Sequence, residues 1–275
     1  MPAILLHDRD EIEAFLRQRP TLHLYELGDL DDFFWPYTTW YALREAGEVR
    51  ALALLYTGTA LPVLLSFIEE EPESSAVGKK ASSSLAENAC VELLHTIRPV
   101  LPRRFYAHLN PGLEAHLEAD YRLTSHGVHL KMALTDRTRL VDIDTTGVVR
   151  LTSADRPALE TLYEASYPGN WFDPRMLETD HYVGLWRDGE IVSVAGVHVY
   201  SPRYGVAALG NITTHPRLRG QGLATRVTGR LCQLLLETVG VIGLNVKGDN
   251  RAAIKCYAGL GFEQVAAYEE FMVEA

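Results

Sequence analysis

The sequence predicts an α/β (α+β) fold of two tandem units, each with a mixed, mostly antiparallel central sheet flanked by helices. Three observations predict this fold: a repeated pattern of strands, helical segments at matching places around each repeat, and a hydrophilic stretch between the two copies. The length of 275 residues is sufficient for two domains of ordinary size.

The repeated strands are the clearest of these signals. The stretch "WYALREAGEVRALALLYTGTALPVLLSF" (residues 40–67) resembles "YVGLWRDGEIVSVAGVHVYSPRYGVAALGN" (residues 182–211). Each contains a short strand, a charged turn with glycine, a second apolar strand, a turn with glycine or proline, and a third apolar strand. This order is typical of a three-stranded antiparallel meander.

The segments around each meander also match. Before the meanders stand a strand and helical material, "AILLHDRDEIEAFLRQR" and "VVRLTSADRPALETLYEAS". In the second of these, Thr152 and Asp155 suit a capping box, and Pro157 suits the first turn of a helix. After the meanders we expect helices at 85–97 and 223–239, strands at 105–109 and 241–246, a short helix and a closing strand pair. With the junction at the hydrophilic residues 135–147, the expected domains are 1–140 and 147–275.

Composition excludes several classes of protein. With 26 Lys and Arg against 36 Asp and Glu, the net charge of -10 argues against a general nucleic-acid binder. No apolar run approaches the roughly 18 residues that span a bilayer, and the N-terminus lacks a signal segment, so we expect no membrane partner. The three cysteines are odd in number and have no metal-type spacing, which favours a cytoplasmic protein without a metal.

One stretch departs from the acidic background: "HPRLRGQGLATR", residues 215–226, concentrates arginine and glycine. A pyrophosphate group needs converging hydrogen-bond donors and positive potential, and the first turn of a helix supplies both. Gly220 and Gly222 allow close approach of the backbone, and Arg217 and Arg219 add charge. The stretch therefore predicts a phosphate cradle at a strand-to-helix turn, the alternative being a plain tight turn on the surface.

The second half of the chain resembles the GNAT superfamily of acyl-coenzyme-A-dependent N-acyltransferases. "RLRGQG" (residues 217–222) matches the family pattern of Arg or Gln, two residues, Gly, one residue, then Gly or Ala, between the fourth strand and the third helix. "DNRAAIKCYAGLGF" (residues 249–262) matches the pattern of the fourth helix. The resemblance covers about residues 148–273 and extends to the first half by topology alone. It implies direct transfer of an acetyl group from acetyl-CoA, as co-substrate, to an amine in a ternary complex, with no metal.

The resemblance also implies a set of cofactor-binding residues. Backbone groups of Ile212, Thr213 and Thr214 would align the pantetheine arm and polarise the thioester carbonyl. Asn250 would contact the pantetheine or the diphosphate, and Tyr257 would protonate the departing thiolate unless it is a core aromatic. The remaining members are Arg217, Arg219, Gly220, Gln221, Gly222, Leu223, Ala224, Thr225 and Ala253. We expect Cys256 to be structural, because the family transfers the acyl group directly.

The general base is the position where the sequence departs from the family. Many members carry Glu or Asp on the fourth strand, whereas "YGVAALGNITTH" has no carboxylate. His198 on the third strand is the first candidate, expected to share one face with Gly196 and Tyr200. The alternatives are His215, or a carboxylate arriving from Glu178 or Asp180, and His198 is otherwise a half-buried histidine bonded within the sheet.

The acceptor site is expected near "YPGNWFDP", residues 167–174. Trp171 and Phe172 would shape the pocket or form a hydrophobic plug. Asn211 and Asn245, on neighbouring strands, would hydrogen-bond substrate or ordered water, or satisfy the gap between the strands. The acceptor is an amine-bearing small molecule, an amino acid or a peptide, and the protein is a monomer or a homodimer.

The first half is expected to be a degenerate GNAT-like copy. In place of the glycine-rich turn it has "IEEEPESSAVGKKASSS" (residues 68–84), whose four glutamates would repel a pyrophosphate. This stretch is expected to be a mobile loop. The copy would serve packing, acceptor binding or dimer contacts. If the chemistry has been lost, the whole chain would instead be a non-catalytic acyl-CoA-binding sensor or scaffold.

Overall fold

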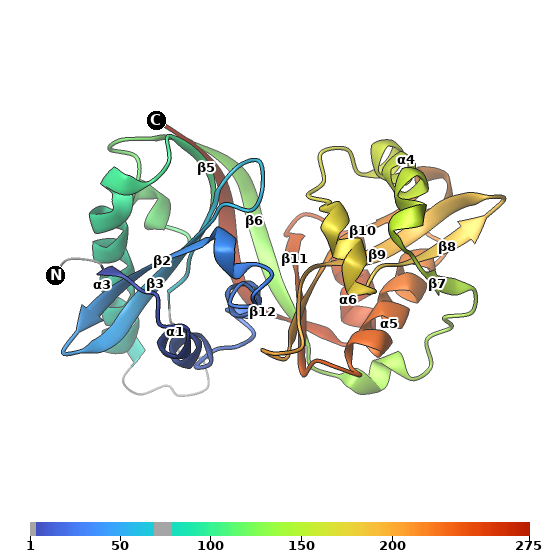
Figure 1. The fold of residues 1–275 in the computed structure, drawn as a ribbon, viewed down its shortest axis with the longest axis horizontal. Helices are drawn as coiled ribbons and strands as arrows, with labels where there is room; N and C mark the ends of the chain where they lie inside the picture. Colours follow the sequence, from blue (N-terminus) through green and yellow to red (C-terminus); the bar gives the residue numbers. More distant parts are fainter. Residues whose placement is uncertain (1–3, 69–78) are drawn as a thin grey trace. The chain divides into compact units, whose positions relative to one another are not determined.

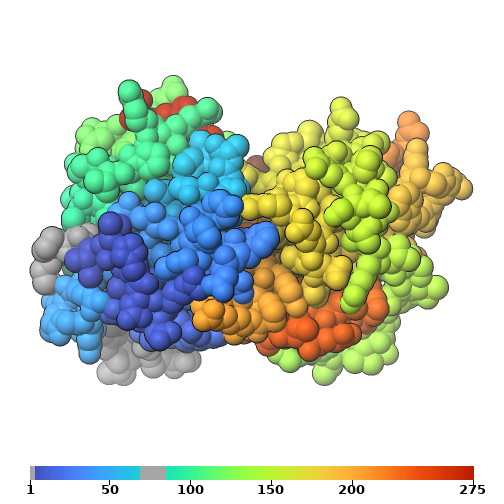
Figure 2. All heavy atoms as spheres, viewed as in Figure 1, coloured from blue at the N-terminus to red at the C-terminus, as the bar shows by residue number. Residues whose placement is uncertain are grey.

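The computed structural model describes residues 4–68 and 79–275, and the chain divides into two compact units (Figure 1). The first unit contains the residues up to 129 together with 267–275, and the second contains residues 130–266. In the space-filling view, red residues from the end of the chain emerge among the green residues of the first unit (Figure 2).

This division differs from the expected boundary between residues 140 and 147. Strand β6 (Arg122–Leu134) begins in the first unit and ends in the second, whereas strand β12 (Phe262–Glu274) runs from the second unit into the first. Because two long strands belong to both units, no single cut in the sequence separates them. A boundary search based on hydrophilic stretches cannot detect this arrangement.

The first unit is a sheet with a long helix on one face. Its strands lie in the order β1-β2-β3-β4-β5-β12-β6, with antiparallel neighbours from β1 to β4, a parallel β4–β5 pair and an antiparallel β5–β12 pair. The elements are β1 (Ile4–Leu5), α1 (Arg9–Leu16), α2 (Leu24–Gly28), β2 (Thr38–Glu45), β3 (Glu48–Tyr56), β4 (Val63–Ser66), α3 (Lys79–Ile97) and β5 (Arg104–Leu109). Leu93 and Leu94 of α3 pack with Phe105 and Ala107 of β5 in the core.

The second unit repeats this plan. Its strands lie in the order β12-β6-β11-β10-β9-β8-β7, where β10 and β11 are parallel and β7 to β10 are antiparallel neighbours. The elements are β7 (Val148–Arg150), α4 (Arg156–Ser166), β8 (Val183–Arg187), β9 (Glu190–Ser201), β10 (Val206–Thr214), α5 (Leu223–Leu235), β11 (Val241–Lys247) and α6 (Arg251–Gly259). Both α4 and α5 pack against β9 and β10.

The predicted fold class and the internal repeat are confirmed. The two meanders are β2-β3-β4 and β8-β9-β10, and each is followed by a helix and a strand parallel to its last member. The capping box of Thr152 and Asp155 is present, in a 3-10 turn that leads into α4. In the predicted mobile loop at 68–84, residues 69–78 lie outside the described residues, and from Lys79 the backbone is already helical.

Among the described residues, no helix is long and apolar enough to cross a membrane. In the same part of the chain, no group of three or more His, Cys, Asp or Glu side chains is placed to hold a metal ion.

Candidate functional site

The parallel strands β10 and β11 part from one another in the middle of the second unit. Their pairing runs from Val206 opposite Val241 to Leu209 opposite Leu244, and β10 continues beyond it to Thr214. Against β9, the register of β10 shifts between Gly210 and Thr213, so that Asn211 and Ile212 form a bulge. A bulge at this place turns the edge of β10 away from β11 and opens a gap between two parallel strands.

Asn211 has the unusual backbone that this bulge requires. Its φ of +54° lies in the left-handed region, which residues other than glycine rarely adopt. The Tyr163 hydroxyl donates a hydrogen bond to the Asn211 carbonyl at 3.0 Å, and the Asn211 amide donates to the Tyr182 hydroxyl at 3.2 Å. The conformation is therefore held by two tyrosines, one from α4 and one directly before β8.

These tyrosines form a buried aromatic layer beside the gap. The Phe172 ring contacts the rings of Tyr163 and Tyr182, with centroids 5.2 and 5.7 Å apart. Burial raises the pKa of both phenols well above their ordinary value, so both stay neutral hydrogen-bond donors. No pattern in the sequence pointed directly to Tyr163 or Tyr182. The sequence signal for Tyr182 was the glycine at position 196 of a strand, because a Cβ there would come within 2.2 Å of the Tyr182 ring.

A second bulge lies opposite, at His198 of β9. Val199 pairs with Ala208 and Val197 pairs with Leu209, which leaves His198 as the extra residue. The half-buried imidazole lies over Gly210, where a Cβ would stand 1.9 Å from the ring. The structure therefore brings the predicted base next to Asn211, at the start of the gap.

The same bulge changes which residues share a face. Gly196 faces the Tyr182 ring, on the side of α4. Tyr200 points the other way, because its hydroxyl donates to Thr238 just after α5 at 3.0 Å and its ring contacts His181. The expectation that Gly196, His198 and Tyr200 line one face is wrong. An inserted residue reverses the alternation of a strand, and nothing in "GVHVYS" marks the insertion.

The glycine-rich turn ends at an open helix N-terminus. Gly220 and Gly222 have φ of +77° and +75°, which favours glycine, and a Cβ at either position would meet no atom within 4 Å. Gly222 is the N-cap of α5 and provides no side-chain cap. The first N–H groups of α5, at Leu223, Ala224 and Thr225, therefore have no side-chain cap, and a helix N-terminus of this kind can bind an anion.

The arginines of this turn have different surroundings. Arg217 is exposed beside the glycines. The Arg219 guanidinium donates to the carbonyls of Thr214 at 3.2 Å and Ser166 at 3.0 Å, which ties the turn to the end of α4. Arg226 binds the carbonyls of Asp144 and Thr146 and pairs with the Asp144 carboxylate. Arg217 is thus the cation of the turn that can approach a phosphate, and Arg219 braces the loop.

Three other predicted residues of this region, Gln221, Thr213 and Thr214, have defined partners within the second unit. The Gln221 side chain accepts a hydrogen bond from Arg187 at 3.3 Å. The side chains of Thr213 and Thr214 bond to Ser166 at 3.1 Å and Ser193 at 2.8 Å, while Ile212 is half-buried. The internal bonds of the threonine side chains orient this part of β10, so its backbone is the part that a ligand in the gap would meet.

Helix α6 packs beside α5. The Asn250 side chain caps it by accepting from the Ala253 N–H at 3.1 Å. Tyr257 is only 8% exposed, and burial, with smaller contributions from Cys256, Tyr167 and Cys232, raises the pKa of its phenol. The Cys256 thiol lies 3.3 Å from the Thr225 hydroxyl, and burial raises its pKa, which disfavours the thiolate that a nucleophile needs.

The remaining candidates are more dispersed. Trp171 is 42% exposed, whereas Phe172 lines an open cavity of about 350 Å³ together with residues of α4 and the following loop. Asn245 is half-buried on β11. His215 accepts the Arg217 N–H on its Nδ1, at 3.3 Å. Glu178 and Asp180 are exposed at the end of a 3-10 helix, Pro174–Thr179.

Taken together, the turn, the gap and the helix N-terminus define an α/β domain that can hold a phosphate-bearing ligand beside a parted pair of strands. Residues 148–262 match the family "Acetyltransferase (GNAT) family", and this part of the chain is a GNAT domain. No curated protein sequence matches the chain at a significant level.

Solved structures resemble the fold over the whole chain. A Drosophila protein has a TM-score of 0.66 at 11% identity, covering 98% of both chains. A GNAT-family acetyltransferase from Colwellia psychrerythraea has a TM-score of 0.56 at 14% identity over 100% of both chains. A tandem GNAT protein from the clavulanic acid biosynthesis pathway has a TM-score of 0.54 at 15% identity, covering 98% of this chain and 97% of its own. At these identities the likeness shows the fold alone.

Proposed function

We propose that the chain is an N-acyltransferase, most simply an N-acetyltransferase that moves the acetyl group of acetyl-CoA to an amine by direct transfer. The observation that carries the proposal is the open N-terminus of α5. It is flanked by Gly220 and Gly222 at positive φ, with free space where a side chain would stand. Because this opening follows β10 directly, a ligand bound there by its phosphates can extend its arm into the gap.

The N–H groups of Leu223 to Thr225 and the exposed Arg217 would hold the pyrophosphate of coenzyme A. Backbone groups of Ile212 to Thr214 would pair with the pantetheine arm, where β10 has left β11. Asn250 is committed through its oxygen to the cap of α6, so its amide nitrogen is the part that remains for the ligand. Arg219 would contribute through the position of the loop.

Transfer requires one proton to leave the amine and one to reach the thiolate. The amine nitrogen attacks the thioester carbonyl, the C–S bond breaks, and coenzyme A leaves as a thiolate. Tyr257 would protonate this thiolate, because a phenol is protonated at neutral pH. The burial that raises the pKa of its phenol also makes it a weaker acid. His198 is suited to accept the amine proton, because the bulge holds its ring at the start of the gap. His215 is the weaker candidate, since its Nδ1 already accepts a backbone N–H.

The acceptor is an amine-bearing small molecule, an amino acid or a peptide. Phe172 has two roles in this proposal, because its ring both packs on Tyr163 and Tyr182 and lines the open cavity beside α4. Trp171 is exposed and would contact only a large acceptor.

One observation favours a second candidate, a non-catalytic acyl-CoA-binding sensor or scaffold. The fourth strand of the domain carries no Asp or Glu, and no acidic residue occurs between Ile191 and Leu236. A protein that has lost its base would keep the cradle and bind the cofactor without turnover.

Thiol release from acetyl-CoA by the full-length protein, against a panel of primary amines, amino acids and peptides, separates the two functions. We expect amine-dependent release with at least one member of the panel, and loss of that release in Gly220→Glu. Tight binding of coenzyme A with no turnover on any amine would favour the sensor. Failure of the chain to bind coenzyme A would contradict both.

A further inference from the structure

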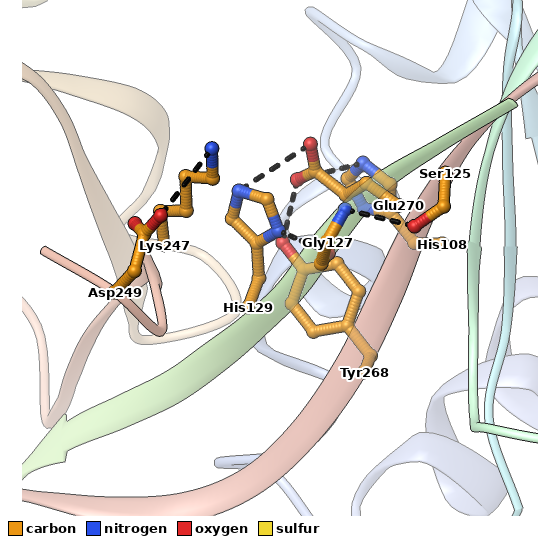
Figure 3. Close-up of polar contacts among 8 residues, drawn as sticks. All are labelled: His108, Ser125, Gly127, His129, Lys247, Asp249, Tyr268 and Glu270. Atoms are coloured by element: carbon orange, nitrogen blue, oxygen red, sulfur yellow. Dashed lines mark hydrogen bonds and ion pairs between the residues drawn. The ribbon is translucent and has the colours of Figure 1, made fainter.

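The first unit contains a row of aromatic and imidazole rings around one carboxylate (Figure 3). Glu270 on β12 stands directly opposite His108 on β5, and Tyr268 lies two residues earlier on the same face of β12. His129 comes from β6, the next strand in the sheet. The rings of His108 and His129 lie against the Tyr268 ring, with centroids 4.9 and 5.6 Å apart.

The carboxylate of Glu270 is mostly buried among these rings. Its side chain is 17% exposed, and the Tyr268 hydroxyl donates to its Oε1 at 2.9 Å. The Nε2 atoms of His108 and His129 stand 3.5 Å from its two oxygens. In the described part of the first unit Glu270 has no arginine or lysine partner. A mostly buried carboxylate is unfavourable without a positive charge nearby, and the two histidines supply such a charge only when they are protonated.

Glu274, on the same strand, has the positively charged partners that a carboxylate in a sheet usually has. Its carboxylate pairs with Arg104 at 3.2 Å and with Arg122 at 2.7 Å. The two glutamates are four residues apart on β12 and share a face. The shortage of positive charge is therefore a property of the ring row and not of the strand.

The tautomer of His129 shows which atoms lack a hydrogen-bond donor. Its Nδ1 lies 3.0 Å from the Gly127 carbonyl oxygen. A carbonyl can only accept, so the hydrogen bond assigns the proton to Nδ1. In the neutral ring, Nε2 then presents a lone pair toward Oε2 of Glu270, 3.5 Å away. Two facing acceptors at this distance are both satisfied by one positively charged group that carries two N–H donors.

The rest of the row provides surfaces that attract cations. Gly127 has φ +90°, and this left-handed residue allows both His126 and His129 to face the same side of the sheet. The His126 ring lies 5.1 Å from Tyr106, which in turn lies 6.4 Å from His108. Burial and, second, the charge of Glu270 raise the pKa of the Tyr106 phenol. The negative potential of the carboxylate therefore extends along the row.

We propose that the rings around Glu270 form a binding site for a small primary ammonium ion, the head group of an alkylamine. One N–H would donate to Oε2 of Glu270 and another to Nε2 of His129. The adjoining methylene groups would lie toward the half-buried Tyr106 ring, since the Tyr268 ring is fully buried against the two histidine rings. This site lies wholly in the first unit and does not depend on the acetyl transfer proposed for the second.

The test is a titration of the full-length protein with n-butylammonium, followed by ¹H–¹³C NMR of the histidine Cε1–H groups. We expect saturable shifts of the His108 and His129 signals. Neutral 1-butanol should produce no saturable shift. Tetramethylammonium, which has no N–H, should bind at least about 10-fold more weakly than n-butylammonium. Equal binding of 1-butanol would overturn the proposal. So would saturation of the site by Zn²⁺ alone with exclusion of n-butylammonium, because the row would then be a metal site.

Two variants on one strand provide the matched comparison. Glu270→Gln should weaken n-butylammonium binding by about 10- to 100-fold, the loss of one charge-assisted contact. Glu274→Gln removes the same charge from a carboxylate that two arginines already neutralise, and binding should be unchanged. His129→Phe keeps a ring but removes the acceptor nitrogen, and should also weaken binding. Wild-type affinity in both Glu270→Gln and His129→Phe would show that the proposal is wrong.

Discussion

In the first unit the parallel strands β4 and β5 stay paired to their ends, where Ser66 stands opposite Leu109. In the second unit the corresponding strands β10 and β11 separate after Leu209 and Leu244, although both continue. The two units share the order of their elements, so the topology does not decide whether this pair of strands parts. The difference lies in the residues that follow the last pair.

After Ser66 the first unit has Phe67 and Ile68, both buried, and the Ile68 N–H donates to the Asn110 side chain at 2.8 Å. After Leu209 the second unit has Gly210 and the left-handed Asn211. Asn110, the residue directly after β5, thus holds the ends of the two strands together as a clamp in the first unit. The register places Asn245 at the matching position of the second unit. The two units thus differ at the two residues that follow the last parallel pair, where β4 and β5 stay paired and β10 and β11 part.

The largest expected effect is on coenzyme A binding and comes from a change in the glycine-rich turn. This turn has no counterpart in the first unit within the described residues. Calorimetry should give one coenzyme A per chain, and Gly220→Glu should weaken binding by about 100-fold or more, because a carboxylate replaces the phosphate at the helix N-terminus. Gly47→Glu is the matched control: Gly47 also has positive φ and open space, in a turn of the first unit. Two equivalent sites per chain would contradict the contrast between the units.

The next effect concerns the proposed acid of the second unit. Tyr257→Phe should lower kcat by about 10- to 1,000-fold, the range of acid–base contributions, while the affinity for coenzyme A changes little. Steady-state kinetics and calorimetry on the same preparation measure the two quantities. Full activity in the Phe variant would reduce Tyr257 to a packing residue.

A smaller effect is expected for the base, since water can replace a lost side chain in part. His198→Ala should lower kcat/KM by about 10- to 100-fold and remove the acidic limb of the pH profile, because a protonated histidine cannot accept the amine proton. Coenzyme A binding should persist. If the limb survives in both His198→Ala and His215→Ala, it belongs to the substrate amine or to a carboxylate, and histidine is not the base.

The smallest effect tests the clamp of the first unit. Asn110→Ala removes the acceptor of the buried Ile68 N–H and should lower the free energy of unfolding by about 1 to 3 kcal/mol. Denaturant unfolding measures the change. Asn245→Ala, at the matching position, should cause a smaller loss. An equal loss at both positions would mean that the closure of β4 and β5 does not depend on the clamp.

The features that could be predicted from the sequence are those formed by residues close together in the chain. The meander turns, the capping box at Thr152 and the glycine cradle each depend on residues that are neighbours in the chain, and their patterns are readable there. The bulges at His198 and Asn211 depend on how two strands align, which a single strand does not encode. The tyrosines that hold Asn211 come from 29 and 48 residues away, so no spacing rule could have found them.

The shared strands β6 and β12 have a consequence for how the chain acquires its structure. Residues 267–274 of β12 complete the sheet of the first unit beside β5, yet they are synthesised only after the whole second unit. The first unit therefore cannot finish folding during synthesis while the second is still being made. Its unpaired β5 edge must wait for a distant segment, a contact of high sequence separation that slows folding. Expression of either unit as one continuous fragment would leave a sheet without one of its strands.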